Sequence, residues 1–251
     1  MFSNDEVVLV TGSSTGIGRA AAIGFAEQGC KVAVHYNSSE EEAREVAGKI
    51  EEAGGEALLV KGDVSDSGDV KRMVGEVEDR YGRLDVLVNN AGSLIERRSL
   101  EEMTEDLWDR VMNVNLKSVF LVSQAVLPMM KRQGKGRIIN VTSLAARNGG
   151  GPGSIAYATA KGGVSTLTRA MAKELVSGGI LVNGVAPGII TTPFHDRYTP
   201  PEVREQMAKA IPIGREGTPE ETIGAVLFLA SSVADYLVGE IIEINGGQLM
   251  D

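Results

Sequence analysis

Short apolar runs alternate with longer amphipathic stretches along the whole chain. The apolar runs have the length of buried strands, and they fall at residues 7–10, 32–36, 57–60, 86–88, 137–141, 180–185 and 241–244. Between them, apolar positions recur at helical intervals in residues 20–26, 40–53, 69–81, 104–133 (as two helices), 155–176, 201–210 and 219–231. Strands that are apolar throughout are typical of a parallel sheet covered by helices on both faces. The pattern therefore predicts a doubly wound α/β fold with seven parallel strands.

The order of these elements also predicts the domain organisation and the place of the functional site. No stretch resembles a linker between two cores, so residues 1–251 are expected to form a single domain. Three loop-like segments, residues 92–98, 147–153 and 188–201, each follow a predicted strand. The carboxyl ends of parallel strands share one edge of the sheet, and open α/β folds bind their ligands there. We therefore expect the site at that edge.

Composition and charge narrow the function classes. The 251 residues carry 25 Lys and Arg against 34 Asp and Glu, a net charge of -9 that disfavours nucleic acid as a partner. The single cysteine, Cys30, excludes an intrachain disulfide, and its apolar surroundings favour a core residue over a nucleophile. Residues 175–194 are uncharged, but their glycines and prolines do not suit a membrane span. The sequence thus predicts a cytoplasmic protein without a membrane partner.

The chain has 31 glycines but no linker or low-complexity tract that would account for them. Glycines at specific positions therefore indicate candidate functional sites. Thr11-Gly12-Ser13-Ser14-Thr15-Gly16-Ile17-Gly18 joins the first predicted strand to the first helix. Gly12 permits a tight turn, Gly16 lets the backbone approach a pyrophosphate, and Gly18 lets the helix pack on the strand. Glycine spacing alone is a weak signal, but its place in a βαβ unit favours dinucleotide binding over an ordinary turn.

A tyrosine and a lysine offer acid–base chemistry. Tyr157 and Lys161 are four residues apart in a predicted helix and so share one face. A nearby ammonium is expected to favour the phenolate, so that Tyr157 could donate a proton to a carbonyl oxygen or take one from an alcohol. Ser143, at the end of the fifth strand, could hold the substrate oxygen beside it. A turn or helix-capping serine is the alternative, and Thr142 competes for either role.

These motifs together resemble the short-chain dehydrogenase/reductase family, in the branch whose members have about this length. Further matches to the family occur in order along essentially the whole chain: Asp63-Val64, Asn89-Asn90-Ala91-Gly92, Asn115, Pro187-Gly188 and Thr192. The resemblance implies a Rossmann-type fold and an NAD(P)(H)-dependent oxidoreductase that interconverts a ketone or aldehyde and an alcohol. It also implies Tyr157 as the general acid/base and a homotetrameric assembly, and no metal.

The resemblance further implies a set of site residues. The catalytic set is Asn115, Ser143, Tyr157 and Lys161. Asn115 would support a water-linked proton relay through the lysine, and Asn113 is its competitor. Asp63 would contact the adenine, and Ile189 and Thr192 would approach the nicotinamide. The expected cofactor-binding residues are Gly12, Ser14, Thr15, Gly16, Ile17, Gly18, Asn37, Ser38, Asp63, Val64, Asn89, Ala91, Gly92, Tyr157, Lys161, Pro187, Gly188, Ile190 and Thr192.

The phosphate state of the cofactor depends on the end of the second strand. An acidic residue there would bond the ribose 2′-hydroxyl and repel a 2′-phosphate. The segment is His35-Tyr36-Asn37-Ser38-Ser39, with no carboxylate before Glu40. The glycine turn carries no arginine either. The sequence favours NADP(H), with NAD(H) as a possible second cofactor.

The substrate is predicted only as a class. The segments 93–98, 144–154 and 194–206 should determine specificity, and they carry Arg97, Arg147, His195 and Arg197. These side chains suit a sugar-derived or oxo-acid substrate, although solvated loop charges explain them equally well. A 3-oxoacyl-ACP reductase is the alternative, and glucose dehydrogenase-like members are also similar. The segment 191–195 departs from the short acidic-Met version associated with the acyl enzymes.

Two other function classes are less well supported. A non-catalytic nucleotide-binding scaffold would not need the complete set of Asn, Ser, Tyr and Lys. An epimerase or dehydratase would usually carry a larger C-terminal substrate domain than the residues after Pro187 can form.

Overall fold

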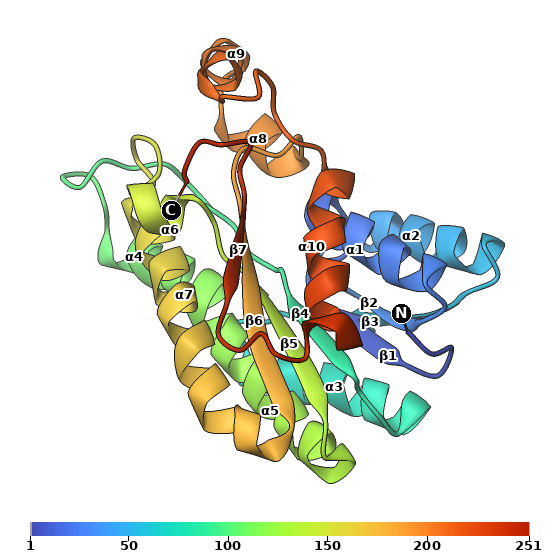
Figure 1. Ribbon diagram of the computed structural model, residues 1–251. Helices are drawn as coiled ribbons and strands as arrows, with labels where there is room; N and C mark the ends of the chain where they lie inside the picture. Colours follow the sequence, from blue (N-terminus) through green and yellow to red (C-terminus); the bar gives the residue numbers. More distant parts are fainter. Residues whose placement is uncertain (1, 251) are drawn as a thin grey trace.

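The computed structural model describes residues 2–250, so the ends of the predicted 1–251 domain lie outside the described residues. Seven parallel strands form one sheet in the order β3-β2-β1-β4-β5-β6-β7 (Figure 1). The strands are β1 (Val7–Val10), β2 (Lys31–Tyr36), β3 (Glu56–Lys61), β4 (Val86–Asn89), β5 (Gly136–Val141), β6 (Ile180–Pro187) and β7 (Ile241–Ile244). All seven predicted strands are confirmed, as is the doubly wound Rossmann-type architecture.

Helices cover both faces of this sheet (Figure 1). One face carries α1 (Gly16–Glu27), α2 (Glu40–Glu52) and α10 (Pro219–Ala230). The other face carries α3 (Ser67–Tyr81), α5 (Ser118–Gln133) and α7 (Ile155–Leu175), and α4 (Glu105–Met112) packs against α7. Within residues 2–250, no helix combines the length and the apolar character that crossing a bilayer requires.

The alternation of side chains along β1 explains why the strand is apolar throughout. Val8 and Val10 pack with the core residues of α1, α2 and α10, whereas Val7 and Leu9 pack with those of α3 and α5. Successive strand residues point to opposite faces, so both sets must be apolar when both faces are covered. Each of these four side chains is at most 1% exposed, and burial of such a side chain contributes about 1.5–3 kcal/mol. Cys30 also lies in the first core, as predicted.

Two of the three predicted loops contain helices. The prediction of an irregular loop at residues 188–201 is wrong at α8 (Pro193–Tyr198), which begins with a proline at its first position, where the missing N–H costs nothing. The segment 147–153 likewise overlaps α6 (Ala145–Asn148). Such short helices were missed because four to six residues give too little periodicity to detect. Together with α9 (Pro201–Ala210), α8 projects beyond the carboxyl edge of the sheet (Figure 1).

The long predicted helical stretch of residues 104–133 has an interruption. Between α4 and α5, residues Asn113–Lys117 form a π-helical turn, η1. Single π-turns inside α-helices often lie at functional sites, because the extra residue turns a side chain out of the regular pattern. Asn115 lies in this turn.

Candidate active site

The glycine-rich turn has the backbone shape that its sequence predicts. Gly12 and Gly16 adopt positive φ angles of 63° and 56°. This backbone conformation is strained for residues that carry a Cβ atom, so it favours glycine. A Cβ atom on Gly18 would lie 2.2 Å from the carbonyl oxygen of Gly12, which leaves no room for any larger residue. Ser14, Thr15 and Ile17 complete the turn and the start of α1. The turn therefore presents bare backbone and the N-terminus of a long helix, which suits a pyrophosphate.

Two polar residues not predicted as site residues hold this turn against β4. The side-chain amide of Asn90 donates to the carbonyl oxygens of Thr11 and Gly12, at 2.9 and 3.0 Å. The Thr11 hydroxyl oxygen accepts from the N–H groups of Asn90 and Ala91, both at 3.0 Å. Asn90 stands inside the Asn-Asn-Ala-Gly motif, so its position was available in the sequence. Its partners were not, because they are 78 to 80 residues away in the chain.

The segment after β6 forms the opposite side of the candidate cofactor site. A Cβ on Gly16 would lie 3.2 Å from the Cγ2 of Thr192, so the turn and this segment face one another closely. Pro187 ends β6, and Gly188 is backed by Asn245, 2.8 Å from where its Cβ would stand. Ile190 is buried and pairs with Gly217. The predicted residues of the two segments are thus brought together, and glycines keep their backbones free of side chains there.

Beyond the turn, the predicted adenosine-side residues lie at the carboxyl ends of β2 and β3. Asn37 and Ser38 follow β2 and are exposed, and Val64 is buried. The Asp63 carboxylate accepts from the N–H and the hydroxyl of Ser65, at 2.8 and 2.7 Å. The Gly62 N–H donates to the Tyr36 carbonyl at 3.0 Å, and this bond holds the segment after β3 beside the end of β2.

Asn89 differs from its neighbours in the motif, because its side chain is turned into the protein interior. Its amide donates to the Ser123 hydroxyl at 3.0 Å and to the Asn140 side-chain oxygen at 2.9 Å. Both N–H bonds of the amide are therefore used by the core. Ala91 and Gly92 lie in the loop after the strand, and a Cβ on Gly92 would lie 2.7 Å from the Asn115 side-chain oxygen and 3.5 Å from the Lys161 ammonium.

Tyr157, Lys161 and Ser143 converge where β5 ends and α7 begins. Ser143 hydrogen-bonds to the Tyr157 hydroxyl and also accepts from the Ala145 N–H at 3.1 Å, so it is a turn serine as well. Lys161 is buried, and its ammonium donates to the Val141 carbonyl at 2.7 Å, 5.7 Å from the centre of the Tyr157 ring. Thr142, the competitor of Ser143, is buried and bonds to the Lys161 carbonyl and to Ser165.

Burial shifts the pKa values of Tyr157 and Lys161 in opposite directions. Burial raises the pKa of Tyr157 to about 12, and the hydrogen bond with Ser143 opposes that rise only in part. Burial also lowers the pKa of Lys161 to about 8. The stabilisation of the phenolate by the lysine and by a nicotinamide's positive ring stays a prediction. Tyr157 is a neutral phenol here, the form that can donate a proton.

Asn115 is held inside the π-helical turn by three hydrogen bonds. Its amide nitrogen donates to the Ser93 and Val111 carbonyls at 2.6 and 2.8 Å, and its side-chain oxygen accepts from the Ser93 N–H at 3.1 Å. The side chain is fully buried next to Gly92. The competing Asn113 has intermediate exposure. Asn115 thereby ties the loop after β4 to the helix beneath it.

The helix α8 covers the tyrosine from the other side. The Phe194 ring lies 5.5 Å from the ring of Tyr157 and 5.1 Å from that of Tyr198. The Tyr198 hydroxyl is 2.9 Å from the Ser93 hydroxyl, so α8 reaches the loop after β4. This contact joins two of the three segments expected to determine specificity.

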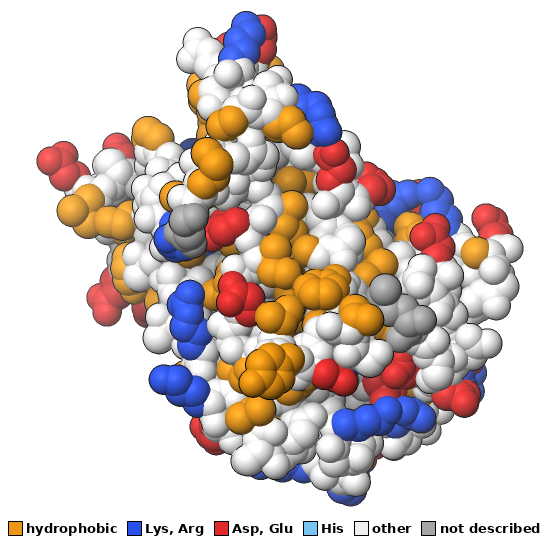
Figure 2. Space-filling view, in the orientation of Figure 1, with side chains coloured by type: hydrophobic (Ala, Val, Ile, Leu, Met, Phe, Trp, Pro, Cys, Tyr) orange, Lys and Arg blue, Asp and Glu red, His pale blue; other side chains and the backbone are white. Residues whose placement is uncertain are grey.

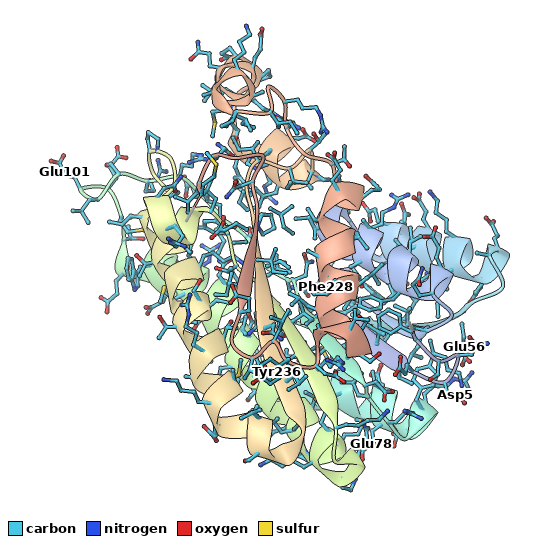
Figure 3. The ribbon with its side chains drawn as sticks, viewed as in Figure 1. Asp5, Glu56, Glu78, Glu101, Phe228 and Tyr236 are labelled. Atoms are coloured by element: carbon cyan, nitrogen blue, oxygen red, sulfur yellow. The ribbon has the colours of Figure 1, made fainter. Side chains whose placement is uncertain are left out.

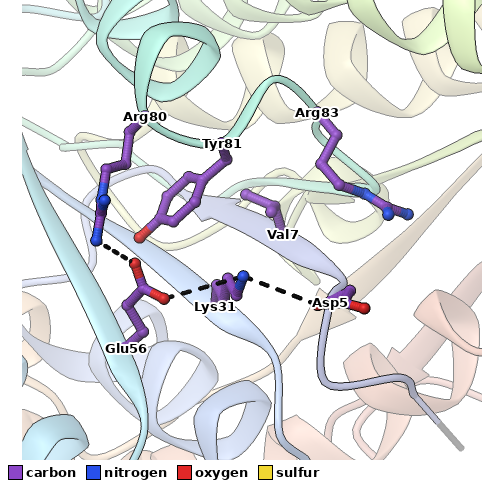
Figure 4. Close-up of a pocket in the computed structure, with 7 residues that line it drawn as sticks. All are labelled: Asp5, Val7, Lys31, Glu56, Arg80, Tyr81 and Arg83. Atoms are coloured by element: carbon purple, nitrogen blue, oxygen red, sulfur yellow. Dashed lines mark hydrogen bonds and ion pairs between the residues drawn. The ribbon is translucent and has the colours of Figure 1, made fainter.

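A separate cavity of about 340 Å³ lies at the opposite, amino-terminal edge of the sheet (Figure 4). Two of its cations pair with its own carboxylates, since Arg80 bonds Glu56 at 2.6 Å and Lys31 lies 4.0 Å from Glu56 and 3.9 Å from Asp5. The third cation, Arg83, pairs with Asp85 at 2.7 Å. The cavity therefore offers mixed, neutralised charge away from the motif residues. The part of the chain that the structure describes contains no cluster of three potential metal ligands.

Comparison with known proteins identifies close relatives. A family model described as enoyl-(acyl carrier protein) reductase matches residues 12–248. The 3-oxoacyl-(acyl-carrier-protein) reductase FabG of Staphylococcus aureus is 43% identical over 242 residues, which cover 96% of this chain and 97% of that protein. The enzyme of the same name from Thermotoga maritima is 42% identical over 242 residues, with the same coverage.

A solved structure supports the same assignment. The crystal structure of levodione reductase superposes with a TM-score of 0.92 at 36% sequence identity, and the match covers 97% of each chain. Similarity of this extent, over nearly the whole of each chain, includes the glycine turn, the tyrosine–lysine pair and the C-terminal strand. The chain therefore belongs to the short-chain dehydrogenase/reductase family, oxidoreductases that transfer hydride between a nicotinamide cofactor and an alcohol–carbonyl pair.

Proposed function

We propose that this protein reduces a carbonyl substrate with NADP(H), using Tyr157 as the general acid. The observation that carries the proposal is the meeting of Tyr157, Ser143, Lys161 and Asn115 beside the glycine turn. The cofactor, when bound, supplies or accepts the hydride. The residues of the glycine turn would hold its pyrophosphate, and those of the segment 187–192 would face its nicotinamide.

Each catalytic residue has a contact that suits its proposed role. Ser143, bonded to Tyr157, would position the substrate oxygen and stabilise its developing charge. Tyr157 would donate its proton to that oxygen. Lys161, anchored on the Val141 carbonyl, would return a proton to the tyrosine from the space next to Asn115. Asn115 would keep Ser93 and Gly92 in place at that space.

The preference for NADP(H) is supported by the surroundings of the β2 terminus. Asn37 and Ser38 are exposed and offer neutral hydrogen-bond donors. The nearest following carboxylate, Glu40, is bonded to Arg44 at 2.7 Å. The guanidinium offsets the repulsion that Glu40 would exert on a 2′-phosphate.

Replacing Asn37 by Asp is expected to lower kcat/KM for NADPH about tenfold, because a carboxylate there would repel the 2′-phosphate. Its kcat/KM for NADH should stay within about threefold of wild type, since the 2′-hydroxyl can donate to the new carboxylate. Asn37→Gln, which keeps the side chain neutral, is the control. Steady-state rates measured from reduced-cofactor absorbance test this prediction. A wild-type enzyme that strongly prefers NADH would contradict it.

For the substrate, Arg97 supports the proposal of an oxo acid or a sugar-derived acid. The half-buried guanidinium donates to the Tyr198 carbonyl at 2.7 Å and to the Pro152 carbonyl at 2.8 Å. Among the described residues it has no carboxylate partner. By contrast, Arg147 lies 3.6 Å from Glu243, and the exposed Arg197 packs on the Tyr198 ring. Arg97 is therefore the cation best placed to meet a substrate anion.

Reduction of 3-oxoacyl thioesters is a second candidate, and the relatives favour it. Three enzymes named 3-oxoacyl-(acyl-carrier-protein) reductase, from Staphylococcus aureus, Synechocystis and Thermotoga maritima, are 41–43% identical to this chain. Their names support this substrate class at least as well as Arg97 supports an acid.

A matched substrate panel separates the two classes. Wild type is assayed with an oxo acid, with its neutral methyl ester and with a 3-oxoacyl thioester. If Arg97 binds the acid, Arg97→Gln should lower kcat/KM for the acid by about tenfold or more and leave the ester nearly unchanged. Arg197→Gln is the control for a nearby exposed cation. A thioester preferred over both small substrates and insensitive to Arg97 would select the acyl function instead.

The proposed homotetramer is supported by apolar surface at the edge of the sheet. Phe228 of α10 is exposed, as are Val233, Tyr236 and Val238 in the segment between α10 and β7. Figure 3 labels Phe228 and Tyr236, and Figure 2 shows hydrophobic side chains gathered on this face of the molecule. Contiguous apolar surface is typical of a protein–protein interface. Sedimentation velocity of the whole chain tests the assembly, and a monomer at micromolar concentration would overturn it. The cytoplasmic location stays a prediction.

A further inference from the structure

His35 is a buried titratable residue that the proposed mechanism does not use. It lies in β2, one residue from the end of the strand, and is 2% exposed. The Gly12 N–H donates to its Nδ1 at 2.8 Å, and its Nε2 lies 2.9 Å from the Gly62 carbonyl oxygen. Its own N–H donates to the Ser13 hydroxyl at 2.8 Å, and its carbonyl accepts from the Ser13 N–H at 2.9 Å. His35 thus joins β2, the glycine turn and the segment after β3.

These partners allow only one form of the imidazole ring. A backbone N–H can only donate, so Nδ1 must present a lone pair to Gly12. A carbonyl oxygen can only accept, so Nε2 must carry the hydrogen that points at Gly62. The ring is therefore neutral and protonated on Nε2 alone. In the imidazolium form, Nδ1 would also carry a hydrogen, and it would oppose the Gly12 N–H.

We propose that His35 is a positioning residue for the cofactor, and that its neutral form holds the glycine turn in the binding shape. Gly12 has a positive φ and is otherwise held by the Asn90 amide, which bonds its carbonyl. His35 bonds the other side of the same residue, so the two side chains together determine where the turn stands. The inference rests on the proposed cofactor-binding role of that turn.

The charged groups around His35 do not favour its protonation enough to overcome burial. Desolvation lowers the pKa of His35, while the bond to Gly62 and the charge of Asp63 oppose that shift. Asp63, in the segment after β3, is engaged by Ser65, and Asp69 of α3 bonds the Asp63 N–H and pairs with Arg72. The segment Thr11–Gly18 contributes no charged side chain. The neutral form is thus present at neutral pH, and it is lost as the pH falls through the lowered pKa.

Two substitutions separate the hydrogen bond from the shape of the ring. His35→Phe keeps a planar side chain but leaves the Gly12 N–H without its acceptor. We expect Kd for NADP+ and for NAD+ to rise about tenfold at pH near 8, as the loss of one buried partner implies. At saturating cofactor, kcat should stay within about threefold of wild type. His35→Asn places an amide oxygen near Nδ1, so Kd should stay within about threefold of wild type.

The pH profile provides a readout that a merely structural role would not move. Kd for NAD+ is measured by calorimetry, because NAD+ has no 2′-phosphate to titrate in this range. For wild type, Kd should rise as the pH falls through the pKa of His35, which burial places below the ordinary histidine value of about 6.5. For His35→Asn it should stay flat over the same range. Asn183→Leu is the control for a purely structural residue. It removes a buried amide of β6 that makes two hydrogen bonds to the backbone, so it should lower Tm without changing Kd.

The outcomes distinguish the failure of this inference from failure of the proposed function. A folded His35→Phe variant that binds cofactor as tightly as wild type would overturn the positioning role. A His35→Asn variant with the wild-type pH profile would overturn the role of the neutral ring. A wild-type chain that binds neither nucleotide would instead overturn the proposed function.

Discussion

Replacing Tyr157 by Phe is expected to lower kcat about 10³-fold, in line with the loss of a positioned general acid. The substitution removes one hydroxyl and keeps the ring, so the packing against Phe194 should persist. The partly buried phenol, whose pKa desolvation raises to about 12, is a proton donor rather than a charge that stabilises the fold. Rates are measured with saturating cofactor and the best substrate of the panel.

The cofactor affinity of the same variant is the control for this prediction. Kd for NADP+ should remain within about threefold of wild type, because the glycine turn and the segment 187–192 are untouched. Ser165 lies on α7, as Tyr157 does, and its hydroxyl is bonded to that of Thr142. Ser165→Ala removes this hydroxyl and should keep nearly full activity. Retention of a large part of kcat in Tyr157→Phe would show that another group supplies the proton.

Replacing Gly18 by Ala is expected to raise Kd for the cofactor by up to about 10²-fold and to lower Tm. The new Cβ would stand 2.2 Å from the Gly12 carbonyl oxygen and 2.5 Å from the Asn90 amide nitrogen. Both distances are shorter than any real Cβ contact, so either the glycine turn or the Asn90 side chain must move. Overpacking of this kind typically costs about 1–3 kcal/mol, and here the displaced atoms form the hydrogen bond that holds the turn proposed to bind the pyrophosphate. Thermal unfolding and calorimetric titration measure the two effects.

Gly48→Ala is the matched control, because Gly48 also lies inside a helix. No atom lies within 4 Å of a Cβ built on Gly48, so an alanine fits there without a clash. Alanine also has a higher helix propensity than glycine, which favours α2. We expect this variant to gain up to about 1 kcal/mol of stability and to bind cofactor as wild type does. If both alanine variants behaved alike, close packing at Gly18 would not be the reason for the glycine.

The element order and the sheet were predictable because their causes are local in the sequence. The alternation of apolar strands with amphipathic helices reports burial on both faces, and the β1 side chains confirm it. The glycine spacing was equally informative, since a backbone with positive φ at Gly12 and Gly16 needs glycine whatever the rest of the chain does. The positions of Tyr157 and Lys161 followed from helix geometry in the same way.

The sequence by itself thus determined the fold class, the edge of the sheet where the candidate site lies and most of the residues proposed for it. Only the tertiary structure decided how that site is held and protonated. Asn90 and His35 reach the glycine turn from distant strands, and α8 lays Phe194 against Tyr157. The raised pKa of Tyr157 has the same origin, since burial is a property of the folded surroundings. Contacts between distant segments and their desolvation are set by packing, which no local pattern records.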